Sequence, residues 1–286
     1  MRKWYKYFLL YGEKSNKNIK KHDNYLEFEK AMGGYDSTEH YSDKKTFINK
    51  YLQGRFEHYN KYLKKHINQK MKILSIASGR CINELQFIDK NYNITCSDLN
   101  IPTSYNSAKR IFKEFNFKVL NILNNHTSEK YDCILSLGLV YAFSENELRN
   151  YLNNVNKSLN TNGELIFDSS SSSNNIITLI YDQIYLKIEI IIISKILNFL
   201  RKKSSIGIRH HGYKFTNNEI IQIAENSGFE LVNIEKRDYL TEVLRSKVIS
   251  KIIKILPPFK YFFVVFGLLM PYLRFFKFRK IKNLNT

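Results

Sequence analysis

Short apolar runs alternate with segments of helical periodicity through the middle of this 286-residue chain. The apolar runs, which have the length of strands, are residues 71–77, 93–99, 117–123, 131–137 and 164–169. The segments between them that have helical spacing are 82–89, 105–115 and 145–159. Strands separated by helices need crossover connections, which place parallel strands in one sheet with helices on both faces. The pattern therefore predicts a Rossmann-like, doubly wound α/β fold.

Two further strands are expected towards the C-terminus. A Thr/Asn cap, an apolar stripe and a glycine stop predict a helix over 216–229, and residues 229–239 predict the sixth strand. Residues 271–278 predict a last strand, which would complete a mostly parallel seven-stranded sheet. The long apolar segments 175–202 and 243–270 are expected to be helical insertions after strands five and six.

The start of the sheet pattern divides the chain into two parts. Residues 1–70 are expected to be mainly helical, with a turn at Gly33–Gly34 and an amphipathic helix near 44–67. They would form an N-terminal extension or lid. Residues 71–286 would form the main domain with its two insertions.

The positive charge of the chain is concentrated at its two ends. The formal net charge is +19, yet residues 73–172 are close to neutral, so residues 1–72 and 173–286 form two basic arms. Such arms attract a polyanion, an anionic membrane surface or an acidic small substrate. Lysine-rich helices that simply face water account for the same charge equally well.

The cysteines favour a reduced, intracellular protein. Cys81, Cys96 and Cys133 make an odd count and have no metal-ligand spacing. Two of them lie in apolar runs that are predicted to be interior strands. Buried free thiols are therefore expected, with neither a disulfide framework nor a metal site.

Neither of the two most apolar segments is expected to span a membrane. Residues 176–200 carry two acidic and two basic side chains, which are costly in lipid. Residues 261–273 contain Pro271 and are shorter than the roughly 20 residues that a spanning helix needs. The first residues, MRKWYKYFLLYGEK, contain an apolar run too short and too aromatic for a secretory signal. We expect a cytoplasmic protein, and a peripheral position at the inner membrane face stays open.

The loop after the first strand, in KILSIASGRCINELQF (72–87), is the best candidate for a ligand site. Open parallel sheets bind ligands beyond the carboxyl ends of their strands. Asp98 ends the second strand 19 residues after Gly79, where a carboxylate accepts the hydroxyls of a ribose. A dinucleotide needs further glycines beside its pyrophosphate, but Cys81 and the residues after it supply none. The pattern favours an adenosine without phosphates, as in S-adenosylmethionine; an incidental acid in a flavodoxin-like sheet is the alternative.

From about residue 70 to 240 the sequence resembles the class I S-adenosylmethionine-dependent methyltransferases. ILSIASGRC is similar to the first motif of that family, SDL to the end of its second strand and FKVLNIL to its third. YDCILSLGLVYAFSENEL, LNTNGELIFDSSS and TNNEIIQIAENSGFELV resemble the later motifs, in the expected order. The resemblance implies that S-adenosylmethionine is the cofactor, with Asp98 on its ribose and Asn121 facing its adenine. The cofactor-binding residues that it implies are Ser75, Ala77, Ser78, Gly79, Asp98, Leu99, Asn121, Leu137 and Gly138.

The first motif departs from the family pattern at three positions. Ser75 stands where the family usually has an acid, which often contacts the amino group of the methionine part. Ala77 and Cys81 stand where it has glycines. Glu84, one turn into the next helix, is either a substitute carboxylate or, as we expect, a solvent-exposed helix acid.

Methyl transfer requires alignment more than chemistry from the protein. The acceptor atom must lie in line with the methyl group, about 3 Å away, and a general base is needed only if the acceptor loses a proton early. His210 and His211, in the basic segment after strand five, and Tyr141, just past strand four, are the candidate catalytic residues. Ordinary surface histidines and a packing aromatic are the alternatives. Asp168, at the end of strand five, is expected to be structural.

These features predict a methyltransferase with a small-molecule or lipid- or glycolipid-like acceptor. The insertions 175–202 and 243–270 are apolar and flanked by Lys and Arg, so we expect them to meet at the carboxyl ends of the strands and to shape a hydrophobic acceptor pocket. Alternatively, they pack on each other or form a dimer interface. An RNA methyltransferase is a second candidate, but the chain lacks an N/D-P-P-Y/F motif and a separable RNA-binding module, so nucleic acid is less favoured. A catalytically degenerate cofactor-binding or membrane-associated protein is a third, and the oligomeric state is not indicated.

Overall fold

The fold is described from a computed structural model, for residues 6–9, 55–102, 105–140, 143–169, 207–210, 215–237, 247–269, 271 and 273–281. The strands are β1 (Lys6–Leu9), β2 (Ile73–Ile76), β3 (Ile94–Asp98), β4 (Asn116–Val119), β5 (Tyr131–Ser136), β6 (Leu159–Ser169), β7 (Gly207–His210), β8 (Phe229–Arg237) and β9 (Leu273–Lys280). The helices are α3 (Arg55–His66), α4 (Ile82–Ile88), α5 (Tyr105–Ile111), α6 (Glu145–Ser158), α10 (Asn217–Asn226), α12 (Lys247–Ile255) and α13 (Phe259–Leu269).

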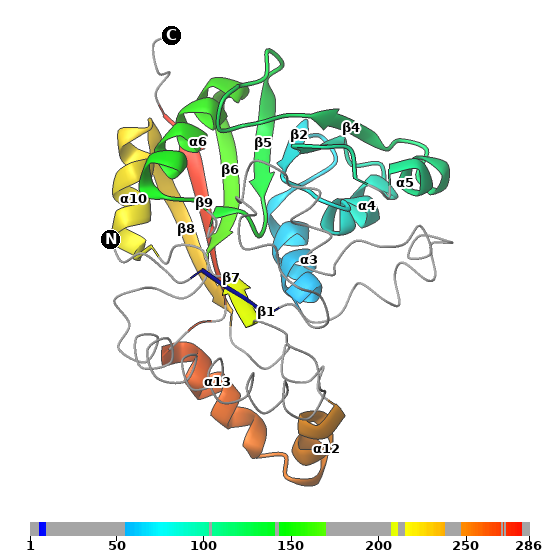
Figure 1. Ribbon diagram of the computed structural model, residues 1–286, viewed down its shortest axis with the longest axis vertical. Helices are drawn as coiled ribbons and strands as arrows, with labels where there is room; N and C mark the ends of the chain where they lie inside the picture. Colours follow the sequence, from blue (N-terminus) through cyan, green and yellow to red (C-terminus); the bar gives the residue numbers. More distant parts are fainter. Residues whose placement is uncertain are drawn as a thin grey trace.

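Seven strands form one mostly parallel sheet (Figure 1). Their order is β4-β3-β2-β5-β6-β9-β8, and β9 runs antiparallel to both of its neighbours. The strand order reverses between β2 and β5, which is where such sheets bind ligands. The predicted Rossmann-like, seven-stranded fold is confirmed.

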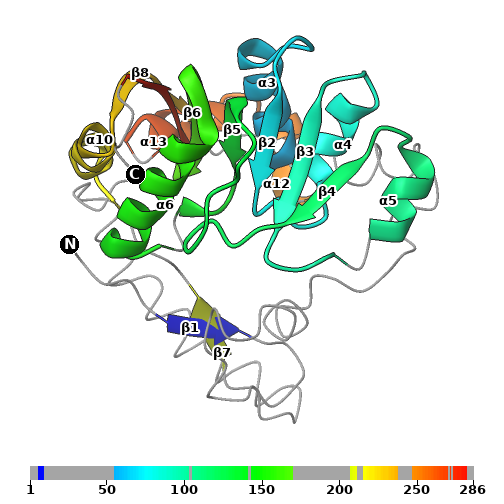
Figure 2. The same ribbon diagram turned by 90° about the horizontal axis from the view of Figure 1, so that it is seen from above.

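Alternation along the strands divides the core into two layers, one on each face of the sheet. Ile73 and its neighbour Leu74 are both fully buried but belong to opposite layers. The layer of Ile73 contains side chains of α3, α4 and α5, and the layer of Leu74 contains those of α6 and α10. Figures 1 and 2 both show α6 and α10 side by side on their face. Because both faces are covered, the central strands are mostly apolar and mostly buried along their length.

Helix α3 attaches the N-terminal extension to the sheet. The Tyr62 ring is fully buried and stacks on Phe275 of β9, with ring centroids 4.3 Å apart. Tyr59, one turn earlier, meets the same Phe275 ring edge-on at 5.6 Å. The helix therefore crosses the sheet face over β9 and carries residues towards the carboxyl ends of the parallel strands.

Two predictions of local structure were wrong. The fifth strand was expected over 164–169, but β6 already begins at Leu159. The register shifts between the pairs Tyr131–Leu159 and Cys133–Glu164, and Asn162 takes a left-handed backbone with φ of 63°. A step of two residues on β5 thus faces a step of five on β6, and the strand continues to Ser169 past this irregularity.

The ends of the chain also differ from the expectation. Residues 6–9 form a strand, not a helix, and pair antiparallel with β7, which lies in a segment expected to be a basic loop. These four-residue strands form a separate small sheet, as Figures 1 and 2 show. The remaining residues of 1–54, with the expected turn at Gly33–Gly34, lie outside the described residues.

Helices α12 and α13 belong to the second predicted insertion. Helix α13 ends at Leu269, and β9 begins four residues later, at Leu273. The second residue of β9, Arg274, pairs with Ser169, the last residue of β6. The two helices therefore lie beyond the carboxyl ends of the parallel strands (Figure 1). Residues 175–202 lie outside the described residues, so the pocket that the two insertions were expected to share stays a prediction. In the described part of the chain, no helix has the length and apolarity needed to cross a bilayer.

Candidate cofactor site

The loop between β2 and α4 has the backbone of a glycine-rich loop although it contains one glycine. Ala77, Gly79 and Cys81 all adopt left-handed conformations, with φ of 52°, 54° and 59°. The Ser78 amide donates to the Ser97 carbonyl (2.9 Å), and the Ser78 hydroxyl donates to the same oxygen (3.1 Å). A left-handed backbone costs an L-residue about 1–2 kcal/mol, which glycine avoids. The loop therefore keeps its shape at the two positions where glycine was expected.

Asp98 fastens this loop to the end of β3. One carboxylate oxygen accepts from the Gly79 amide and the other from the Leu99 amide, each at 2.7 Å. The side chain is 3% exposed, and burial raises the pKa of the Asp98 carboxyl while the two amides lower it. Gly79 and Asp98, two of the residues singled out in the sequence, are thus joined directly at the carboxyl ends of adjacent strands. Each carboxylate oxygen retains a second acceptor lone pair.

Glu84 is buried, so the expectation that it is a solvent-exposed helix acid was wrong. It lies in the first turn of α4 and is 1% exposed. Its Oε1 accepts a 2.7 Å hydrogen bond from the Ser75 hydroxyl in β2. Burial raises the pKa of Glu84 to about 7, and the nearby negative charge of Asp98 adds to the effect.

A third buried carboxyl lies where β5 and β6 end. Asp168, 3% exposed, accepts a hydrogen bond from the Gly138 amide and another from the Tyr59 hydroxyl at 3.0 Å. Gly138 is left-handed, with φ of 73°, and among the described residues a Cβ atom added there would meet nothing closer than the Tyr59 hydroxyl at 3.9 Å. The backbone at Gly138 is therefore open to close approach by a ligand.

The other predicted cofactor residues lie at the same edge of the sheet. Leu99 follows Asp98 directly and is half-buried. Asn121 follows β4, and its Oδ1 accepts from the Leu123 amide at 3.1 Å in a local turn. Leu137, half-buried after β5, packs against the core layer of α3 and α4. The carboxyl ends of β2, β3, β4 and β5 thus bring all nine predicted residues to one edge.

The described part of the structure does not show where the side chains of the candidate catalytic residues lie. His210 contributes its backbone to β7, where it pairs with Lys6, and its side chain is outside the description. His211 and Tyr141 lie outside the described residues altogether. Their roles stay predictions.

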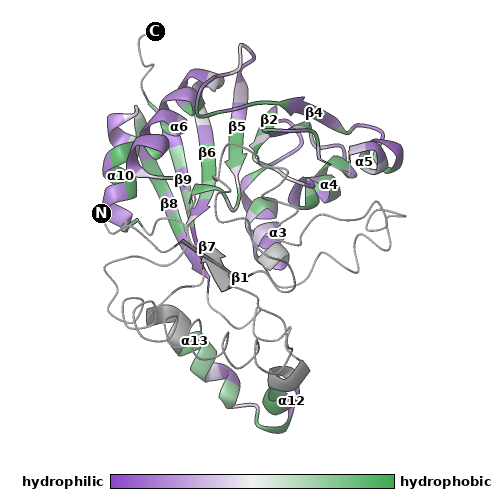
Figure 3. Cartoon of the chain, in the orientation of Figure 1, coloured by the Kyte–Doolittle hydropathy of each residue, from purple (hydrophilic) through white to green (hydrophobic). Residues whose placement is uncertain are grey.

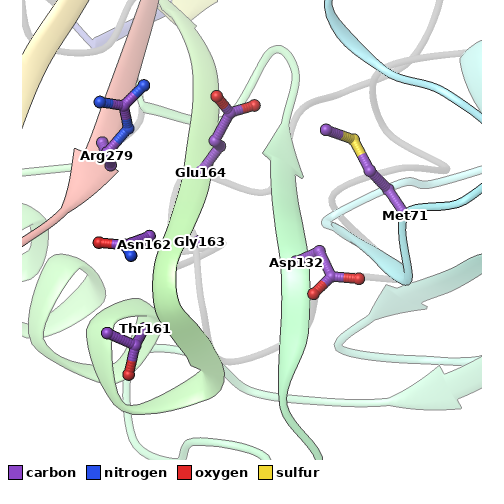
Figure 4. Close-up of a pocket in the computed structure, with 7 residues that line it drawn as sticks. All are labelled: Met71, Asp132, Thr161, Asn162, Gly163, Glu164 and Arg279. Atoms are coloured by element: carbon purple, nitrogen blue, oxygen red, sulfur yellow. The ribbon is translucent and has the colours of Figure 1, made fainter.

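A surface hollow of about 550 Å³ lies at the opposite edge of the sheet (Figure 4). It is lined by Met71, Asp132, Thr161, Asn162, Gly163, Glu164 and Arg279. Asp132 accepts from the Lys72 amide at 2.9 Å, and Glu164 pairs with Lys277 at 2.8 Å. These carboxylates already hold structural partners, and the hollow lies at the amino ends of the parallel strands, so we do not assign it to the cofactor.

The three cysteines are free and buried, as expected from the sequence. Within the described ranges, no group of three His, Cys, Asp or Glu side chains is arranged to hold a metal ion. The groups that the edge does offer are carboxyls: Glu84, Asp98 and Asp168 end up buried there in a strongly basic protein. Buried carboxyls favour a ligand that carries positive charge.

Sequence reasoning missed Tyr59 and the burial of Glu84. Glu84 precedes the buried Ile88 by four residues, so both lie on one face of α4. That spacing was a readable signal, but the charge of Glu84 argued against it. Tyr59 lies in the predicted amphipathic helix, and nothing in the sequence connects it to Asp168, 109 residues away.

Comparison with solved structures identifies the fold. The chain is similar to an S-adenosylmethionine-dependent methyltransferase from Methanosarcina mazei (TM-score 0.51, 16% identity, 77% of this chain and 97% of that one). It is also similar to the 1,6-didemethyltoxoflavin-N1-methyltransferase of Burkholderia thailandensis, solved with 1,6-didemethyltoxoflavin and S-adenosylhomocysteine (TM-score 0.52, 13% identity, 85% of each chain). A third similar structure is the glycopeptide N-methyltransferase MtfA complexed with S-adenosylhomocysteine (TM-score 0.50, 9% identity, 80% of this chain and 91% of that one).

The fold is therefore that of the class I S-adenosylmethionine-dependent methyltransferases, as the sequence motifs predicted. No protein-family model matches the sequence, and no curated protein matches it either.

Proposed function

We propose that this protein is an S-adenosylmethionine-dependent methyltransferase. The observation that carries the proposal is the loop of β2, which keeps three left-handed residues and bonds its Gly79 amide to Asp98 at the strand-order reversal. The methyl donor is a cation with a ribose and an amino-acid part. Asp98 would accept from the ribose hydroxyls, and the buried carboxyls at this edge would offset the positive charge. Similar folds solved with S-adenosylhomocysteine support the same cofactor.

The cofactor would supply an electrophilic methyl group, and the protein would hold the acceptor in line with it. Alignment of this kind needs a closed, shaped site more than a reactive side chain. Where the acceptor must lose a proton, His210, His211 and Tyr141 are the residues that we propose as a base. The strand β7 holds the backbone of His210, 41 residues after the end of β6.

We propose a small-molecule acceptor of apolar, lipid-like character, taken up at the cytoplasmic face of a membrane. The hairpin of α12 and α13 supports this. Its connection exposes Ile255 (84%) and Leu256 (56%), and the next helix exposes Tyr261, Phe262 and Val265. Figure 3 shows this region as largely hydrophobic. A water-facing apolar surface of this kind marks an interaction site.

The lysines of the hairpin fit an anionic lipid surface. Lys251 and Lys254 are exposed on α12, and the Lys260 ammonium lies 5.0 Å from the ring centre of Tyr261. Apolar side chains would enter the interface while the lysines stay at the headgroups. In a flotation assay, the protein should bind vesicles that contain phosphatidylglycerol, and binding should weaken with salt. Replacing Ile255 and Leu256 by Ser should abolish binding, whereas replacing the exposed Val119 and Ile101, at the other end of the sheet order, should not.

The activity itself is tested with cell extracts. Purified protein, S-adenosylmethionine and separate lipid, metabolite and RNA fractions should yield a product heavier by one methyl substitution in the lipid or metabolite fraction. A methylated product in the RNA fraction alone would favour the RNA methyltransferase suggested by the basic arms. No product in any fraction, despite cofactor binding, would favour a degenerate cofactor-binding protein.

A further inference from the structure

Glu84 is a buried acid, although it looks like an ordinary helix residue in the sequence. The residue is 1% exposed. It lies in the first turn of α4, just after the loop whose Gly79 amide donates a hydrogen bond to Asp98. The Ser75 hydroxyl occupies its Oε1 at 2.7 Å. Its other oxygen, Oε2, is buried and has no hydrogen-bond partner in the described part of the protein.

A carboxylate oxygen that is buried without a partner is costly, so a protein retains one only with a reason. A structural cap for Ser75 is not a sufficient reason. A hydroxyl can be satisfied by a neutral amide or by a backbone carbonyl, as Ser97 shows by donating to the Ser75 carbonyl at 2.9 Å. Glu84 instead brings an ionisable carboxyl with a vacant acceptor oxygen to the back of the loop.

Ser75 and Glu84 together replace one expected residue. In the resembling family an acid stands at position 75, on the strand, and here that position holds Ser75. The carboxyl comes from α4 instead and meets the position-75 side chain by hydrogen bond. A carboxyl group thus lies beside position 75, although it is attached to the helix and not to the strand.

We propose that Glu84 supplies the negative charge that holds the ammonium group of an adenosyl amino acid at the loop after β2. The inference rests on the proposed function, since it concerns the same cofactor. The carboxyl lies out of water, so its charge is poorly screened and acts on an ammonium group at the loop. Asp98 would then select the ribose, and Glu84 would select adenosyl compounds that carry an amino group.

The test compares two ligands that differ in this amino group. S-adenosylhomocysteine carries it, and an analogue with hydrogen in its place does not. Binding of both is measured by calorimetry to the wild-type protein and to Glu84→Gln, which keeps the size of the side chain and the bond to Ser75. We expect Glu84→Gln to lower the affinity for S-adenosylhomocysteine about 10- to 100-fold. The affinity for the deaminated analogue should change less than about threefold.

A charge relocation provides the second arm. The double variant Ser75→Asp/Glu84→Ser returns the carboxyl to the strand and should recover most of the lost affinity for S-adenosylhomocysteine. Equal weakening of both ligands by Glu84→Gln, or no weakening of either, would overturn the role of Glu84. If the wild-type protein binds neither ligand, the proposed function fails instead, and melting curves of each variant identify any that does not fold.

Discussion

Tyr59, in α3, donates a 3.0 Å hydrogen bond to the carboxylate of Asp168, which lies 109 residues further along the chain. The same carboxylate accepts from the Gly138 amide. One acid at the end of β6 therefore joins the N-terminal extension to the open glycine beside the cofactor edge. Asp168 is structural, as expected, but what it holds in place is part of the site.

Replacing Tyr59 by Phe should destabilise the protein and disturb the site together. The change removes a buried hydrogen bond to a carboxylate, which is worth about 1.5–3 kcal/mol. Urea unfolding should report a loss of that size, and affinity for S-adenosylhomocysteine should fall with it. Tyr92→Phe, a half-buried ring in the same core layer, is the matched control. Unchanged stability and affinity in Tyr59→Phe would show that the bond does not hold the site.

Asp98→Ala should weaken cofactor binding by about 1–3 kcal/mol, because the ribose hydroxyls lose a charged acceptor. The structure adds a second cost. The Gly79 and Leu99 amides lose their partner as well, so stability should fall by a similar amount while the fold survives. Asp98→Asn retains one oxygen acceptor, so its cofactor affinity and stability should lie between those of the wild type and of Asp98→Ala. Wild-type affinity in Asp98→Ala, measured by calorimetry, would remove Asp98 from the site.

Ala77 offers a test of the backbone shape of the loop. Its φ of 52° suits glycine, so Ala77→Gly should keep cofactor binding and leave stability unchanged or raise it by up to about 1 kcal/mol. Ala77→Val places a β-branched side chain in the same conformation and should cost about 2 kcal/mol or more. Thermal melts of both variants check the pair. If Val and Gly are tolerated equally, the loop does not have this backbone in solution.

Glu84 should make the stability of the protein depend on pH. Its pKa of about 7 in the folded state lies above the ordinary value of 4.5, so the folded state binds the extra proton between these values. The stabilisation is complete below about pH 4.5 and is lost as the pH rises through 7, amounting to about 3 kcal/mol.

The variant Glu84→Gln has no carboxyl that titrates at this position, so its unfolding free energy does not fall for this reason as the pH rises. The difference in unfolding free energy between the variant and wild type should therefore grow in favour of Gln by about 3 kcal/mol from pH 5 to pH 8. The titratable neighbours Asp98 and Cys96 are present in both proteins, so their own contributions to the pH dependence largely cancel in the difference. The same substitution at the exposed Glu114 is the control. A difference that is flat with pH would mean that Glu84 is solvated.

The parallel sheet could be predicted from the sequence because its central strands are buried on both faces and therefore form short, mostly apolar runs between helical segments. Topology then brought Gly79 and Asp98 together, since both follow adjacent parallel strands. The strands β1 and β7 could not be predicted, because four residues on a small separate sheet show no period. The early start of β6 was hidden by Asn162–Gly163, which has the composition of a turn but lies within the strand at the register shift.

Of the candidate site, the sequence allowed the positions of the residues in the fold to be predicted, whereas their roles in binding stay predictions. The nine residues named from the motifs lie at one edge, because motif order reflects strand order. The burial of Glu84 was missed because a single charged residue on a short helix is usually exposed, and its partner Ser75 lies on another element. The left-handed backbone at Ala77 and Cys81 was also invisible, since neither side chain favours it.

The carboxyl-end edge of the sheet is proposed to bind an adenosyl amino acid and not a dinucleotide. Calorimetric titration of the 286-residue chain with S-adenosylhomocysteine, and separately with NAD, distinguishes the two ligands. We predict one site per chain for S-adenosylhomocysteine, weakened in Asp98→Ala, and no binding heat with NAD. Saturable binding of NAD with no response to S-adenosylhomocysteine would contradict the assignment.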